Sequence, residues 1–253
     1  MKTQNQNQLQ SILKTTGTLG FAIATLCLAG CASTPYHKGD AAAVSLQNAA
    51  SEVQGQSRAL EVTMGSLDDL VNKPEPDLKP QYKRFSKSLD NLAGYARRNE
   101  RSQARVRTKS GDYFEAWDKE LATVNYENIR THGQERKTEV INSFNSVNKR
   151  YHESQDAMGP LLSYLYDVRK VLDYDLTPGG IEAVKPIVGK ARENADRVQL
   201  ALGRLTTELA SSGSKMSSVA YQNATLPATG TQQAKAQTQP PAEAQPQEQA
   251  AQK

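Results

Sequence analysis

The chain has few cysteines and few aromatic residues. It contains two cysteines in 253 residues, and aromatic residues make up 6% of the chain and hydrophobic residues 37%. So small a supply of large apolar side chains argues against a thick globular core, although it is sufficient for narrow apolar seams between helices. Cys27 lies in a segment that we expect to be removed, so Cys31 would be alone and no internal disulfide could form.

Groups of residues that carry out chemistry are also scarce. His132 and Glu135 have the spacing of one helix face, as do His152 and Asp156. Each pair offers two ligands, whereas a zinc site needs three or four. No serine lies in a nucleophile-elbow motif, and Gly179-Gly180 follows a proline instead of a strand, unlike a phosphate-binding loop. We therefore expect no enzyme activity, metal or cofactor.

The formal net charge of +4 comes from the ends of the chain. Five lysines and two glutamates lie outside residues 32–213, which leaves 26 basic and 25 acidic residues inside that range. A near-neutral body does not offer the basic surface that a polyanion needs. The sequence pI of 8.9 is therefore no argument for nucleic-acid binding.

Residues 1–30 have the layout of a secretory signal peptide. Lys2 and Lys14 are the only charged residues there, and they precede an apolar run over residues 18–30. This run is about a dozen residues long, whereas a helix that spans a membrane needs about 20. We expect the segment to be removed and not to remain as a transmembrane helix.

The signal ends in Leu28-Ala29-Gly30-Cys31, which resembles the lipobox of bacterial lipoproteins. The alternative is a plain signal peptide, which would leave an unpaired thiol in an oxidising compartment. We therefore expect lipid on Cys31, and the two or three acyl chains of a lipoprotein anchor it stably to a membrane. Ala32 stands where an aspartate would resemble an inner-membrane retention signal. The expected location is thus the outer membrane, facing the periplasm.

Composition divides the rest of the chain into three parts. We expect a lipidated linker over residues 31–40 and a helical coiled-coil domain over residues 41–212. Residues 213–253 are rich in Gln, Ala and Pro and have few large apolar side chains. Such a stretch buries too little surface to offset the entropy of ordering, so we expect a disordered tail. Contact of this tail with the cell wall is left open.

Four segments carry apolar residues at alternating spacings of three and four, which is typical of helical seams. They cover residues 46–71, 82–117, 140–172 and 184–209. Prolines and glycines separate the first segment from the second and the third from the fourth, and short connections favour antiparallel neighbours. We predict an all-α fold, an elongated antiparallel four-helix coiled-coil bundle. The central segments are longer, so their hairpin should project by about 20 Å at about 1.5 Å per residue.

Four residues interrupt the seams. Pro160 predicts a kink in the third helix. Pro186 leaves two alternatives, because the fourth helix either starts beside it or has kinked first turns. Asn99 and Gln103 lie in the second seam, where buried polar residues usually fix register at some cost in stability.

The tip of the predicted hairpin contains the only tryptophan of the chain. Exposed aromatic residues at such a tip are good anchors for a partner or a membrane interface. Tyr113 and Trp117 keep the seam register, which favours a role in closing the hairpin. Phe114 and Tyr126 are therefore the stronger candidates for partner contact, and Trp117 is the weaker one.

The second segment also carries a basic stretch. Arg98, Arg101 and Arg105 fall on one helix face and could contact anionic head groups or phosphates. The alternative is a solvated face that pairs with acidic residues of a neighbouring helix.

Five further stretches form a recognisable set: Ala116-Trp117-Asp118-Lys119-Glu120-Leu121, Arg150-Tyr151, Met158-Gly159-Pro160-Leu161-Leu162, Tyr164-Leu165-Tyr166-Asp167-Val168 and the connection over residues 172–183. They resemble the motifs of a family of uncharacterised bacterial coiled-coil lipoproteins, a domain of unknown function. The resemblance covers roughly residues 36–212, and it diverges at Leu176-Thr177-Pro178-Gly179-Gly180. It implies a helical fold and an envelope location, and it implies no activity or functional residue.

Two functional hypotheses follow. The first is a non-enzymatic, lipid-anchored envelope protein that serves as a helical scaffold or adaptor for a protein partner at the hairpin tip. The second is a binder of anionic lipid or cell-wall polymer that uses the basic helix face or the tail. Both involve a membrane through Cys31 and no nucleic acid, and both leave homo-oligomerisation open.

Overall fold

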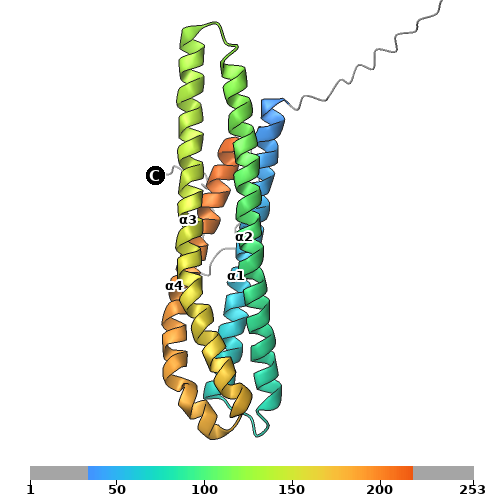
Figure 1. Cartoon of the computed structure of the whole chain (residues 1–253), viewed down its shortest axis with the longest axis vertical. Coiled ribbons are helices and arrows are strands. Elements are labelled where there is room, and N and C mark those ends of the chain that lie inside the picture. Colours follow the sequence, from blue (N-terminus) through green and yellow to red (C-terminus); the bar gives the residue numbers. More distant parts are fainter. Residues whose placement is uncertain (1–33, 219–253) are drawn as a thin grey trace, which may run out of the picture. The chain divides into compact units, whose positions relative to one another are not determined.

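The computed structural model describes residues 34–218, and this part of the chain is all-α. Its four helices are α1 (Pro35–Asn72), α2 (Lys79–Leu121), α3 (Glu127–Tyr174) and α4 (Pro178–Met216). They run antiparallel in chain order (Figure 1). The signal segment, Cys31 and all but the first residues of the predicted tail lie outside the described residues. No helix within residues 34–218 combines the length and the apolar character that a membrane crossing requires.

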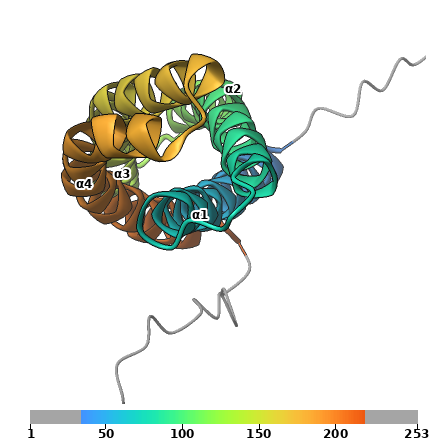
Figure 2. The same cartoon turned by 90° about the horizontal axis from the view of Figure 1, so that it is seen from below.

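The four helices form a ring when viewed along the bundle (Figure 2). Each helix packs against the next one in the chain, and α4 closes the ring against α1. The interior is filled by fully buried side chains from every helix, among them Leu46, Leu67, Phe85, Leu89, Leu161, Leu165, Leu202 and Leu205. These residues belong to the four predicted seams, so the prediction of a four-helix bundle is confirmed.

Prolines start three of the helices and also occur inside two. Pro35, Pro80 and Pro178 lie in the first two positions of α1, α2 and α4, where no intrahelical donor is lost. Pro160 lies inside α3, which changes direction in its second half (Figure 1). Pro186 lies inside α4, eight residues after its start, and the first turns of α4 bend away from the rest. Of the two alternatives for Pro186, the structure therefore shows the kinked helix.

The connection before α4 requires glycine at position 180. The Thr177 hydroxyl caps the helix by accepting a hydrogen bond from the Gly180 backbone N–H at 3.2 Å. A Cβ atom at residue 180 would lie 1.9 Å from the carbonyl oxygen of Asp175. Only glycine leaves room for the carbonyl oxygen of Asp175 at this distance. The close contact explains why the connection has glycine at position 180.

The outer helices are longer than their apolar rhythm predicts. α1 begins at Pro35, inside the predicted linker, and α4 continues to Met216, beyond the predicted domain end. The added turns are buried through small residues, Gly39, Ala42, Ala43, Ser212 and Gly213. Small side chains allow close helix contact but contribute little to a pattern of large apolar residues, which is why the prediction missed these turns.

The α2–α3 hairpin projects beyond α1 and α4 (Figure 1). A Cβ atom on Gly39 of α1 would lie 3.1 Å from the Tyr113 ring of α2 and 2.9 Å from the carbonyl oxygen of Met216 in α4. Tyr113 therefore marks the level where α4 ends. α2 continues for eight residues to Leu121, which is about 12 Å at about 1.5 Å per residue. The connection to Tyr126 and the first turns of α3 complete the projecting part.

Candidate functional site

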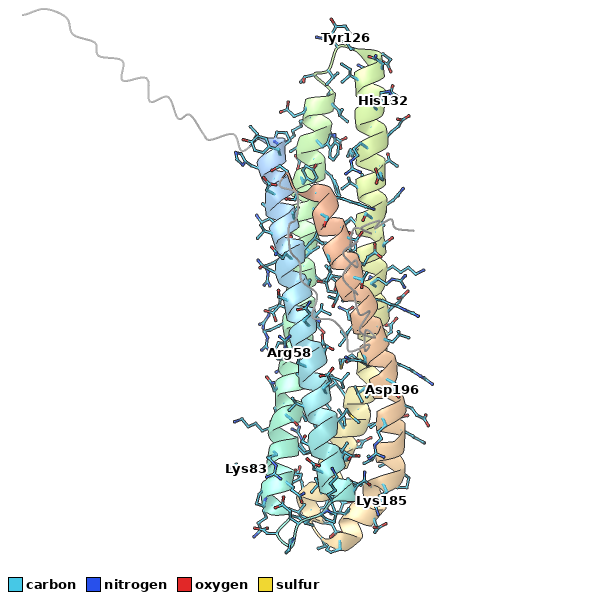
Figure 3. All side chains as sticks on the ribbon, turned by 180° about the vertical axis from the view of Figure 1, so that it is seen from behind. Arg58, Lys83, Tyr126, His132, Lys185 and Asp196 are labelled. Atoms are coloured by element: carbon cyan, nitrogen blue, oxygen red, sulfur yellow. The ribbon has the colours of Figure 1, made fainter. Side chains whose placement is uncertain are left out.

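The tip of the hairpin exposes two large apolar side chains. Tyr126 is the residue before the first turn of α3, and Ile129 lies in that turn. Tyr126 is 72% exposed and Ile129 is 57% exposed. Figure 3 shows Tyr126 at the outermost end of the hairpin, pointing away from the body. The sequence-based prediction of an exposed aromatic tip therefore holds for Tyr126, and Ile129 extends the same surface.

Phe114 and Trp117 are both half-buried, but in different surroundings. Phe114 is half-buried and packs edge-on against Phe144 of α3, with the ring centroids 5.8 Å apart. Trp117 is half-buried against Tyr113, with the centroids 5.2 Å apart. Trp117 also lines the groove beside the start of α1, so its role in closing the hairpin stays a prediction. Phe114 and Tyr126 do not share an exposed surface, because Phe144 of α3 covers part of the Phe114 ring.

A charged pair joins the two helices below the tip. Lys137 of α3 is 7% exposed, and its ammonium group contacts the carboxylate of Asp118 in α2. Nearer the tip, Glu127 and Arg130 form an ion pair within the first turns of α3. The tip surface therefore has the Glu127–Arg130 ion pair next to the apolar side chains of Tyr126 and Ile129. Protein interfaces commonly combine apolar and polar groups in this way.

The start of α1 adds a groove on the side of α2. Its walls include Tyr36, Tyr113, Trp117 and Val124, and Tyr36 is 56% exposed. Tyr36 was not among the predicted site residues, although its place five residues after Cys31 is visible in the sequence. This end of the body therefore presents aromatic side chains close in sequence to the expected anchor.

Asp40 ties the ends of α1 and α4 together below this groove. Its carboxylate accepts hydrogen bonds from the backbone N–H of Ser218 at 2.7 Å and from the Ser218 hydroxyl at 2.8 Å. The backbone hydrogen bond, followed by the hydroxyl, lowers the pKa of Asp40. The last described residue of the body is thereby fixed beside the first helix.

The three arginines of the predicted basic face have different surroundings. The Arg98 guanidinium lies 3.5 Å from the Glu52 carboxylate of α1 and 3.9 Å from the centroid of the Tyr95 ring. Arg101 and Arg105 are exposed and form no ion pair within residues 34–218. Arg98 therefore follows the alternative reading, in which a basic residue pairs with a neighbouring helix. Of the three arginines in the anion-contact hypothesis, Arg101 and Arg105 are therefore available to an anion.

The polar residues of the second seam meet partners from two other helices. Asn99 donates a hydrogen bond from Nδ2 to Oε1 of Gln56 in α1. Gln103 accepts one from Gln155 of α3, at 2.9 Å. Tyr151 of α3 is buried at the same level, and this burial raises the pKa of its hydroxyl. Asn99 and Gln103 thus link α2 to both neighbours, as expected of residues that fix register.

A family model described as a protein of unknown function (DUF2959) matches residues 31–214. The chain belongs to this family. The match covers all four helices, and it confirms the resemblance to an uncharacterised family. No curated protein and no solved structure shows significant similarity to the chain.

His132 and Glu135 form a pair near the tip of this DUF2959 member. His132 Nδ1 lies 3.0 Å from a carboxylate oxygen of Glu135, and both side chains are exposed. Figure 3 shows His132 on α3, near the end of the hairpin. Within the described residues, no group of three or more His, Cys, Asp or Glu side chains could hold a metal ion. The His132–Glu135 contact is therefore described as a surface pair.

Proposed function

We propose that the protein is a non-enzymatic, lipid-anchored envelope lipoprotein that acts as a helical scaffold or adaptor. In this proposal, Cys31 carries the lipid, the outer membrane holds the protein on its periplasmic side, and the α2–α3 tip meets a protein partner. The observation that carries the proposal is the pair of exposed apolar side chains at the tip, Tyr126 and Ile129.

The position of the tip supports a role in contact. Beyond the level of Tyr113, α4 no longer covers the hairpin, and α1 adds only its first residues on the side of α2, so the end of the hairpin is accessible. An exposed aromatic residue beside an aliphatic one supplies the kind of apolar contact on which protein interfaces depend. The Lys137–Asp118 pair and the ring contacts of Phe114 hold the two helices together below the tip.

The contact residues are Tyr126 and Ile129 in this proposal, with Phe114 and Trp117 as their support. Because Phe114 is half-buried against Phe144, its replacement would mainly weaken the packing between α2 and α3 and would change little of the exposed surface. The alternative function, binding of anionic lipid or wall polymer, gains less support. Arg98 is engaged by Glu52 and Tyr95, which leaves Arg101 and Arg105 for an anion.

In-cell photocrosslinking tests the proposal. A photoreactive residue replaces Tyr126, and a matched probe replaces Tyr174, which is 75% exposed at the opposite end of α3. We expect one envelope protein to be captured from position 126 and not from position 174. Equal capture at both positions, or lipid alone at position 126, would contradict the adaptor.

The anchor needs a separate test. Replacement of the lipid-bearing thiol by Cys31→Ser should move the protein from the membrane fraction to the soluble periplasmic fraction. Mass spectrometry of the mature wild-type N-terminus should show a diacylglyceryl cysteine as its first residue. Wild-type protein in the soluble fraction would contradict lipid attachment at Cys31. The partner contact at the tip would still be tested separately by the crosslinking experiment.

A further inference from the structure

The bundle contains a cavity of about 140 Å³ at the level of the polar residues. It is bordered by Gln56 of α1, by Ala96 and Asn99 of α2, and by Tyr151, Met158 and Leu162 of α3. A buried water needs about 10–15 Å³ on this kind of measure, and an engineered cavity of about 150 Å³ in another protein binds benzene. The cavity is therefore large enough for several waters or for one small organic molecule.

Two buried polar atoms at this cavity have no hydrogen-bond partner. Asn99 is 6% exposed, and its Nδ2 is used by Gln56 while its Oδ1 has no donor. Tyr151 is 1% exposed, and its hydroxyl makes no well-formed hydrogen bond, although Ser102 lies beside it. A buried polar group without a partner destabilises the folded protein, so the two atoms favour an occupant that hydrogen-bonds to both.

The lining restricts the chemistry of that occupant. Oδ1 of Asn99 can only accept a hydrogen bond, and the Tyr151 hydroxyl can donate one. Side chains of Ala96, Met158 and Leu162 supply apolar walls. Glu100 is the one charged residue among the described lining residues, and it is exposed. The charge of Arg105 acts on the Tyr151 hydroxyl from outside the lining, but no cation lies in the lining itself to pair with a buried anion. The site therefore favours a neutral molecule with a hydrocarbon body and a hydroxyl group.

The cavity lies along the least closely packed side of the bundle. α2 and α3 make far fewer contacts with each other than the other three neighbouring pairs do. Gly159, at the rim, faces open space, and Pro160 beside it cannot donate a backbone hydrogen bond.

We propose that the space between Asn99 and Tyr151 is a binding site for a small neutral alcohol or phenol. The ligand hydroxyl donates to Oδ1 of Asn99 and accepts from the Tyr151 hydroxyl, and its hydrocarbon body packs on Met158 and Leu162. The site is distinct from the hairpin tip, and it does not depend on the proposed adaptor function.

Calorimetric titration with phenol tests the site in the full lipidated protein, held in lipid nanodiscs. Toluene has nearly the same shape but no hydroxyl, so it should bind at least tenfold more weakly than phenol. Empty nanodiscs correct for partition of both compounds into lipid. This comparison uses the wild-type chain alone and does not depend on the folding of any variant.

Two substitutions locate the binding. Ala96→Leu fills the space and should weaken phenol binding at least tenfold, and Asn99→Leu should do the same by removing the acceptor. Ala104→Leu, at an exposed position of the same helix, is the matched control and should leave the affinity unchanged. Circular dichroism confirms the helical content of each variant.

Three results would overturn the proposal. No saturable phenol binding to the wild-type protein would mean that ordered waters alone occupy the cavity. Equal affinity for phenol and toluene would show that the two polar atoms play no part. Unchanged phenol affinity in a folded Ala96→Leu variant would place the binding elsewhere.

Discussion

The four-helix part of the body and the two-helix tip are built differently. Below the level of Tyr113 each helix has two neighbours, and residues such as Leu161 are fully buried. Above that level α4 no longer contributes, α1 adds only its first residues beside α2, and aromatic rings such as Trp117 are half-buried. A two-helix segment cannot bury a continuous core, so its side chains are available for contact at little cost to the fold. The comparison suggests that the four-helix part supplies stability and the tip supplies recognition.

The largest effect on stability is expected in the four-helix core. Leu161→Ala removes a side chain with 0% exposure, and such changes cost about 2–5 kcal/mol. Leu200→Ala is the matched control, because Leu200 is 56% exposed, and it should change stability by less than about 0.5 kcal/mol. Denaturant unfolding of the full protein measures both. Equal losses would show that α3 is not the core element described.

A smaller loss is expected inside the hairpin. Phe114→Ala removes a half-buried ring and its edge contact with Phe144, so we expect a loss of about 1–2 kcal/mol, below that of a fully buried phenylalanine. Hydrogen exchange should show the faster-exchanging amides near the tip and not near Pro178. A loss as large as that of Leu161→Ala would mean that the hairpin belongs to the main core.

Alkaline pH should weaken the end opposite the tip. Burial, followed by a hydrogen bond to the Asp173 carboxylate, raises the pKa of Tyr82 to about 12, whereas an unfolded tyrosine has a pKa of about 10. The neutral phenol is favoured in the folded state, so its contribution is complete below pH 10 and is lost as the pH rises towards 12. Denaturation midpoints across this range should fall less in Tyr82→Phe. An identical fall in both proteins would exclude Tyr82 as the cause.

The smallest effect on stability is expected at the tip surface. Tyr126→Ser together with Ile129→Ser changes two exposed side chains, so the free energy of unfolding should change by less than about 0.5 kcal/mol. Thermal unfolding of the double variant measures this directly. A loss above about 1 kcal/mol would mean that these side chains support the hairpin and are not free for a partner.

Periodicity predicted the seams because each helix buries one face in a ring of four. The pattern of large apolar residues did not reveal the contacts of Gly39 and Gly213, since small residues pack by letting backbones approach. Contacts between side chains of different helices depend on how the two helices are aligned and how far apart they lie. The apolar pattern of one helix does not predict either property. The separation of α2 and α3 decides that Phe114 faces inward, and the alignment of α1 with α2 pairs Glu52 with Arg98.

The tip residues were only partly predictable for the same reason. Tyr126 could be named because it lies in a connection, outside any seam. The sequence could not identify Gln56 as the partner of Asn99, because the two residues lie on different helices. The apolar pattern of one helix does not show which residue of the next helix lies opposite. The unpaired Oδ1 of Asn99 and the cavity beside it require the assembled bundle.

Affinity purification of an envelope partner tests the central proposal most directly. The full-length protein and its Tyr126→Ser/Ile129→Ser variant are compared at equal abundance in the cell, with Tyr174→Ser as the exposed control at the other end of α3. We predict that the partner captured by wild type is lost from the tip variant and retained by the control. Retention of the partner by a folded, membrane-bound tip variant would contradict recognition by the hairpin.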